Sequence, residues 1–149
     1  MAAERAPFAT RLLRRPLRDN AILLEAVSAL LASWAAVRFL PFRRAIMSGA
    51  RVLGSRGCRS VTIEAVSRAV EVASKRVPWR AVCFQQGLAL QWMLRRRGFD
   101  ARLHYGVGYA GSAELQAHVW VTVGDEIVIG AQQVPLVRCV ASYPQAPNW

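Results

Sequence analysis

The sequence has few cysteines, and this shortage excludes several classes of protein. The three cysteines are Cys58, Cys83 and Cys139, an odd number without close pairs. This usage argues against a disulfide framework and is compatible with a reducing cytoplasm, where we expect the protein to be located. Because no two cysteines stand in a C-x-x-C spacing, we do not expect a structural zinc site.

Several other signatures are missing. The chain contains no glycine-rich phosphate loop, no internal repeat and no signature of a nucleic-acid-binding fold, so we expect no cofactor and no nucleic-acid partner. There is no clean secretory signal. The longest apolar segment, residues 26–37, is bounded by Glu25 and Arg38 and is shorter than the ~20 residues that span a bilayer. We interpret it as a buried helix, with an interfacial helix as the alternative.

Acidic residues and lysine are also scarce, which leaves a basic, arginine-rich chain. Lys and Arg number 20 against 9 Asp and Glu, for a net charge of +11, and Lys75 is the only lysine. Arginine binds carboxylates and phosphates in a bidentate manner. Three interpretations remain open at this stage: a solvated basic face, a surface for an acidic peptide or protein, and peripheral association with an anionic membrane.

Length and composition indicate one packed domain. The chain has 149 residues, of which 54% are hydrophobic and only 19% charged, a composition that excludes a disordered chain. We divide the sequence into a basic N-terminal arm at 1–19, a single domain at 20–140 and an irregular tail at 141–149.

Helical patterns fill the first two thirds of this domain. We predict helices over residues 21–39, ended by Pro41, and over 42–53, ended by Gly54. A third helix begins at Ser60 or Thr62 and ends near residue 76. A fourth runs over 83–97 with Gly98 at its end, and it is apolar around most of its circumference, which is typical of a central helix.

The pattern then changes to the alternation of strands. We predict strands over residues 101–107, 115–123 and 126–129, with a loop at 108–113 and a turn at Gly124 and Asp125. Helices followed by an antiparallel sheet indicate the α+β class.

The most informative residues are Cys83 and His118. Cys83 stands where a loop turns into the fourth predicted helix, and His118 stands within the second predicted strand. A helix N-terminus and a nearby imidazolium both favour the thiolate, the form of cysteine that attacks a carbonyl. The histidine can then return the proton to the leaving amine. The alternative interpretation is a buried, inert cysteine.

Four segments carry a resemblance to a known family. They are VPWRAVC (77–83), GLALQWMLRRRG (87–98), ARLHYGV (101–107) and AHVWV (117–121). In order, spacing and flanking residues they resemble the lasso-peptide leader peptidases, the B-type maturation proteins of lasso-peptide biosynthesis, which have a transglutaminase-like core. The resemblance covers roughly residues 20–140, and its specific motifs lie between 77 and 123.

The resemblance implies a cysteine peptidase that removes the leader from a ribosomally made precursor peptide. Cys83 matches the nucleophile of the family and His118 the base. A separate ATP-dependent cyclase then closes the freed core peptide. Larger members carry an additional leader-binding domain, for which this chain is too short, so the resemblance also implies a separate leader-recognition protein as a partner.

The match fails at the third catalytic residue. The family commonly has an Asp twelve residues after the histidine, and that position is Gly130 here. Asp125, in the predicted turn, lies about 20 Å along the strand from His118 and is too far away. Gln132 falls on the same face as position 130 and could orient the imidazole with its neutral amide, although a simple surface glutamine is the alternative. Trp120 could form a wall of the substrate cleft or belong to the core.

Two further hypotheses remain open. The missing acid at position 130 favours a catalytically weak scaffold that presents the precursor to the cyclase. The basic, apolar composition is also compatible with a protein that binds a membrane or nucleic acid.

Overall fold

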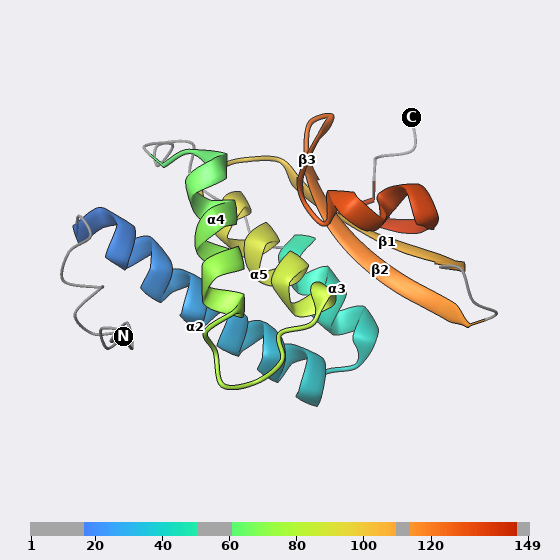
Figure 1. The fold of residues 1–149 in the computed structure, drawn as a ribbon, viewed down its shortest axis with the longest axis horizontal. Helices are drawn as coiled ribbons and strands as arrows, with labels where there is room; N and C mark the ends of the chain where they lie inside the picture. Colours follow the sequence, from blue (N-terminus) through green and yellow to red (C-terminus); the bar gives the residue numbers. More distant parts are fainter. Residues whose placement is uncertain (1–16, 51–60, 110–113, 146–149) are drawn as a thin grey trace, which may run out of the picture.

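The structure is a computed structural model, which describes residues 17–50, 61–109 and 114–145. Within these residues, four helices precede three strands, and a short 3-10 helix and a fourth strand follow. In Figure 1 the helices form one layer on the left and the strands form a sheet on the right. The predicted α+β class is confirmed.

Helix α5 (Cys83–Arg96) is central, as its sequence predicted. Leu88, Leu90, Met93 and Leu94 are completely buried, and they join the hydrophobic core that α5 forms with the sheet and the other helices. The close approach of helix and sheet needs a glycine, because a Cβ on Gly87 would lie 2.8 Å from a methyl group of Val119.

Helix α2 (Leu17–Phe39) packs along α4 and α5 (Figure 1) and buries Ile22, Ala26 and Leu30. Between Asp19 and Phe39 this helix is long and apolar enough to cross a membrane by length and composition, the same properties that a core helix of a soluble protein has. It begins at Leu17, so the last three residues of the predicted 1–19 arm belong to the helix, whereas residues 1–16 lie outside the described part of the chain.

The remaining helices lie close to their predicted positions. Helix α3 (Phe42–Ala50) starts after Pro41, whose carbonyl accepts hydrogen bonds from the amides of Arg44 and Ala45. Helix α4 (Ile63–Ser74) starts at the Thr62 cap, where the hydroxyl accepts a hydrogen bond from the amide of Ala65 at 3.2 Å. Such a cap satisfies one of the amides that the first turn leaves unpaired.

The sheet has the order β3-β2-β1-β4, with every neighbouring pair antiparallel. Strands β1 (Ala101–Tyr109) and β2 (Leu115–Val123) form the long central hairpin, and a turn through Gly124 (φ 59°) leads to β3 (Glu126–Ile129). Strand β3 pairs with β2 only from Val121 to Val123, so the other half of β2 pairs with no strand on this side within the described part of the chain.

The last two elements were not predicted. The 3-10 helix η1 (Ala131–Leu136) connects β3 to β4 (Arg138–Tyr143), which adds to the sheet at the far edge of β1. The fold thus extends to Tyr143, three residues into the segment that we expected to be an irregular tail. Helix η1 holds Gln132 and Gln133 beside β2, where His118 lies.

Candidate active site

Cys83 is the first residue of α5. The preceding residue, Val82, is extended (φ −75°, ψ 162°) and forms no side-chain cap. The first backbone hydrogen bond of the helix joins the amide of Gln86 to the carbonyl of Val82, so the Cys83 amide belongs to the turn whose N–H groups have no carbonyl partner within the helix. This is the position expected of an oxyanion donor and of an activated thiol.

The loop before Cys83 is fixed by side-chain contacts. Gln86 turns back and donates a hydrogen bond from Nε2 to the carbonyl of Ala81 at 2.8 Å. Trp79 packs against Trp34 of α2, with ring centroids 6.1 Å apart. The half-buried Cys83 is thus held at the junction of a fixed loop and a fixed helix.

His118 lies in β2 and is 6% exposed. Its Nε2 lies 2.9 Å from the carbonyl oxygen of Gly130. A carbonyl can only accept a hydrogen bond, so Nε2 carries the proton, and in the neutral ring Nδ1 is the basic atom. The ring is therefore held in the tautomer that leaves Nδ1 available to receive a proton.

Gly130, where the resembling family has an acid, is thus the hydrogen-bond partner of His118. Its backbone is left-handed (φ 83°), and a Cβ there would lie 2.9 Å from the Val119 carbonyl oxygen and 3.0 Å from His118 Nε2. Only glycine fits this position without strain. The sequence shows that position 130 lacks the acid that the resemblance implies. A backbone carbonyl has no sequence signature, so the hydrogen bond between the Gly130 carbonyl and His118 could not be predicted.

Gln132 lies in η1 and is exposed. It lines a pocket of about 280 Å³ together with His118 and Gly130, but among the described residues no hydrogen bond joins it to His118. Its role as an orienting residue stays a prediction. The same pocket contains Glu71 of α4. Nothing in the sequence marks this carboxylate as part of a site, because the residue lies in an ordinary amphipathic helix.

Trp120 is buried, at 6% exposure, and its indole stacks on two histidine rings. It stacks on His104 at 5.3 Å and on His118 at 6.2 Å between centroids. His104 is linked to Ser142 Oγ and Thr122 Oγ1 through its two ring nitrogens, at 2.7 and 2.9 Å. Burial and the nearby charge of Arg102 lower the pKa of His104 from its ordinary value of 6.5. Trp120 therefore stacks on both histidine rings, and its role as a cleft wall stays a prediction.

The predicted pair of Cys83 and His118 comes from two layers of the fold. Val119 faces Gly87, one turn after Cys83, so alternation along β2 directs His118 to the other face. In the described chain no hydrogen bond joins the Cys83 thiol to His118. The pairing of Cys83 with His118 therefore stays a prediction.

The other cysteines lie apart from this site. Cys139 is exposed in β4, and its sulfur lies 3.7 Å from Ser142 Oγ. Cys58 lies outside the described residues. Within residues 17–50, 61–109 and 114–145, no group of three or more His, Cys, Asp or Glu side chains could hold a metal ion.

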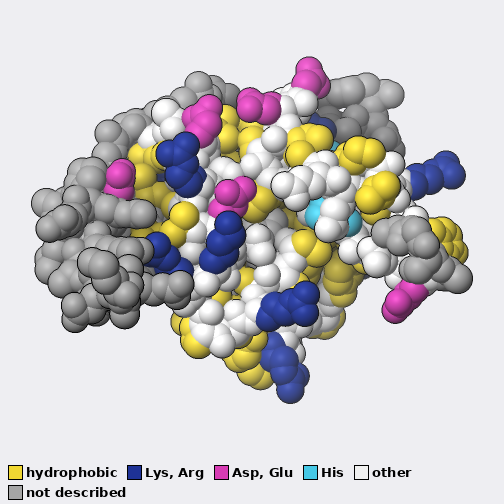
Figure 2. Space-filling model, viewed as in Figure 1, with side chains coloured by type: hydrophobic (Ala, Val, Ile, Leu, Met, Phe, Trp, Pro, Cys, Tyr) yellow, Lys and Arg dark blue, Asp and Glu magenta, His cyan; other side chains and the backbone are white. Residues whose placement is uncertain are grey.

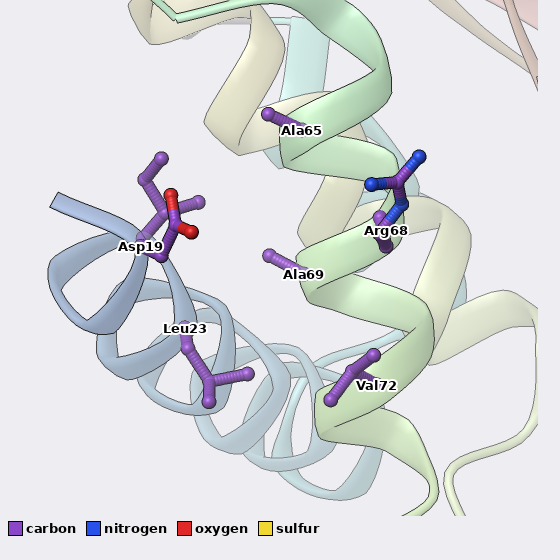
Figure 3. A pocket seen from close by; sticks show the side chains of 7 residues that line it. Asp19, Leu23, Ala65, Arg68, Ala69 and Val72 are labelled. Atoms are coloured by element: carbon purple, nitrogen blue, oxygen red, sulfur yellow. The ribbon is translucent and has the colours of Figure 1, made fainter. Parts of the chain in front are cut away.

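A second pocket, of about 100 Å³, lies between the N-terminal part of α2 and α4. Figure 3 shows Asp19 and Leu23 from α2 on one side, with Ala65 and Ala69 of α4 directed toward them. Its lining is mostly aliphatic and contains neither a cysteine nor a histidine. It therefore lacks a nucleophile and a base, and it is a weaker candidate than the pocket at His118.

Comparison with known proteins assigns the family. No curated protein and no solved structure matches the chain. A family model described as the transglutaminase-like superfamily matches residues 26–138, a segment that runs from α2 to β4 and includes Cys83, His118 and Gly130. This segment is well over half of the 149 residues. The chain therefore belongs to the transglutaminase-like superfamily, which includes cysteine peptidases.

Proposed function

We propose that the protein is a cysteine peptidase that removes the leader from a lasso-peptide precursor, with Cys83 as the nucleophile and His118 as the base. The observation that carries the proposal is the hydrogen bond from His118 Nε2 to the Gly130 carbonyl, at 2.9 Å. It leaves Nδ1 as the basic atom of a ring on the central strand, while α5 begins with Cys83. Helix-borne thiol and strand-borne imidazole are the two groups that this chemistry needs.

The reaction follows from the two groups. His118 Nδ1 takes the proton of the Cys83 thiol, and the thiolate attacks the carbonyl carbon at the junction of leader and core. The Cys83 amide stabilises the resulting oxyanion. His118 then donates the proton to the departing core amine, and water attacks the acyl-enzyme to release the leader with a new carboxylate.

The Gly130 carbonyl supports the imidazolium less strongly than a carboxylate would, because it carries only a partial charge. Glu71 lines the same pocket and brings a full negative charge to it. We expect this arrangement to give a slow enzyme that depends on the delivery of its substrate.

The partners follow from the resemblance of residues 77–121 to the lasso-peptide leader peptidases. A separate leader-recognition protein delivers the precursor, and an ATP-dependent cyclase consumes the released core in the cytoplasm. The net charge of +11 supports contact with an acidic leader or an acidic partner surface.

The test is mass spectrometry of the precursor peptide after incubation with the protein and the leader-recognition partner. Cleavage at one bond by the wild type and the Cys139→Ala variant, and not by Cys83→Ala, is the expected result. Equal cleavage by Cys83→Ala would eliminate the proposal.

A non-catalytic scaffold that presents the precursor to the cyclase is the second candidate. The missing acid at position 130 and the absence of a hydrogen bond between the described Cys83 and His118 favour it. Iodoacetamide distinguishes the two, since an assisted thiol reacts faster. For the enzyme, alkylation of Cys83 should slow about tenfold in His118→Ala while exposed Cys139 keeps its rate. For the scaffold, the alkylation rates of Cys83 and Cys139 should both be the same in His118→Ala as in the wild type.

A further inference from the structure

The junction of α2 and α3 presents large apolar side chains to solvent. Phe39 is 72% exposed, Leu40 42% and Phe42 53%. Pro41 separates the two helices here, and the amide of Leu40 is still bonded to the carbonyl of Ala36 at 2.9 Å. The apolar side chains thus stand on a fixed, protruding corner of the helical layer (Figure 1). We call residues 38–44 the α2–α3 corner.

The α2–α3 corner is also strongly basic. Arg38, Arg43 and Arg44 are exposed, and none of them forms a salt bridge with a described carboxylate. The sequence contains no Asp or Glu from residue 26 to residue 63. Figure 2 shows hydrophobic and Lys or Arg side chains together at the bottom of the view, where the C-terminal end of α2 and the loop between α4 and α5 lie.

The apolar surface continues along α2. Further exposed side chains of this helix are Leu24 at 62%, Leu31 at 50%, Trp34 at 37% and Val37 at 36%. Trp34 contacts Phe39 edge to face at 6.3 Å, which connects this surface with the α2–α3 corner. Exposed apolar side chains in this number on one helix and its adjoining corner are typical of an interaction site.

We propose that the α2–α3 corner binds the surface of an anionic membrane, with Phe39 and Leu40 inserted among the acyl chains and the three arginines on lipid phosphates. The charge of the arginines complements that of anionic headgroups. A convex apolar tip bordered by guanidinium groups fits the boundary between headgroups and acyl chains, which accepts both kinds of side chain.

The helix lies on the membrane and does not cross it. Ile22, Ala26 and Leu30 belong to the core that α2 shares with α4 and α5. Arg97, the residue that caps the C-terminal end of α5, donates two hydrogen bonds to Glu25, one of them 2.9 Å long. Insertion across the bilayer would expose this core and break the ion pair, whereas binding through the α2–α3 corner disturbs neither.

Vesicle flotation of the full chain tests the proposal. We expect binding to vesicles of phosphatidylcholine with roughly one third phosphatidylglycerol, weakened by salt, and little binding to phosphatidylcholine alone. Phe39→Ser should reduce binding about tenfold, since the burial of a phenyl ring is lost. Arg43→Gln and Arg44→Gln should each reduce it about fivefold.

Matched control variants distinguish binding through the α2–α3 corner from non-specific binding of the protein to vesicles. Leu115→Ser removes a leucine that is 58% exposed at the far end of β2, and Arg138→Gln removes an exposed arginine of β4. Both should bind as the wild type does. The proposal is overturned if these controls lose as much binding as the corner variants, or if wild type fails to float. It is also overturned if sedimentation shows a dimer that Phe39→Ser dissociates, which would make the corner a contact between two copies.

Discussion

At the scale of single residues, the candidate site depends on a backbone atom. His118 is oriented by the Gly130 carbonyl, and the left-handed backbone of Gly130 directs this carbonyl at the ring. Position 130 has no room for a side chain. An acid introduced there would therefore displace the His118 ring instead of stabilising its protonated form. A main-chain carbonyl therefore contacts His118 at the position where the resemblance to the leader peptidases implies a carboxylate.

Gly130→Ala should lower cleavage activity and stability together. The added Cβ meets the Val119 carbonyl oxygen at 2.9 Å and His118 Nε2 at 3.0 Å. The matched control is Gly124→Ala, since Gly124 is also left-handed (φ 59°) but has nothing within 4 Å of the new atom. We expect Gly124→Ala to cost about 1 kcal/mol in urea unfolding with normal activity, and Gly130→Ala to cost more and to lose most activity. Equal activity of the two variants would contradict the role of the carbonyl.

His104 should make the protein less stable in mild acid. Burial and the charge of Arg102 lower its pKa from 6.5 in the folded protein, so the unfolded chain binds the proton first as the pH falls. The stabilisation is complete above pH 6.5 and is lost as the pH falls from 6.5 toward the folded pKa. Thermal unfolding of wild type and His104→Gln across this range measures the effect. The melting temperature of wild type should fall more steeply than that of the variant, and parallel curves would refute the assignment.

At the scale of elements, α2 is joined to α5 by a partly buried ion pair. Arg97 contacts both carboxylate oxygens of Glu25, and Arg96 lies 3.6 Å away. The hydrogen bond to Arg97 lowers the pKa of Glu25 below its ordinary value of 4.5, and the charges of Arg97 and Arg96 lower it further. The ion pair fixes the position of α2 along the central helix.

Glu25→Gln should destabilise the protein at neutral pH by about 1–2 kcal/mol, measured by urea unfolding. A lowered carboxyl pKa gives stability that is present above pH 4.5 and is lost as the pH falls through the folded pKa. The difference between wild type and variant should therefore shrink in acid. Asp100→Asn is the control, because Asp100 is 65% exposed in its pairs with Arg95 and Arg102, and it should change stability little.

The elements that the sequence predicted are those with a local signal. The Thr62 cap, Pro41, Gly98 and the alternation of β1 and β2 set boundaries that the structure reproduces closely. Strand β4 was missed because residues 138–143 show no clear alternation, and the strand is stabilised by long-range contacts. It pairs with β1, more than thirty residues earlier, and its Tyr143 carbonyl accepts a hydrogen bond from Gln91 Nε2. Helix η1 was missed for a related reason. It connects β3 to β4, which lie at opposite edges of the sheet, and so it depends on the placement of both strands.

At the scale of the whole molecule, the two residues of the proposed catalytic pair come from different layers of the fold. Cys83 belongs to the helical layer and His118 to the sheet, so their relative position depends on how closely α5 approaches β2. Gly87 sets the distance between α5 and β2. It lies one turn after Cys83 in α5, and it faces Val119, the neighbour of His118 in β2. A change at this contact should therefore alter activity without touching either reactive group.

Gly87→Ala tests this dependence. The new methyl group would lie 2.8 Å from Val119 Cγ1, and a β-branched side chain has little freedom to move aside. We expect a loss of about 1–3 kcal/mol of stability from overpacking, together with lower cleavage activity at temperatures where the variant is folded. Val119→Ala removes the atom in contact, so the double variant should recover part of both losses. Strictly additive effects of the two substitutions in unfolding and cleavage would show that the Gly87 contact does not position the site.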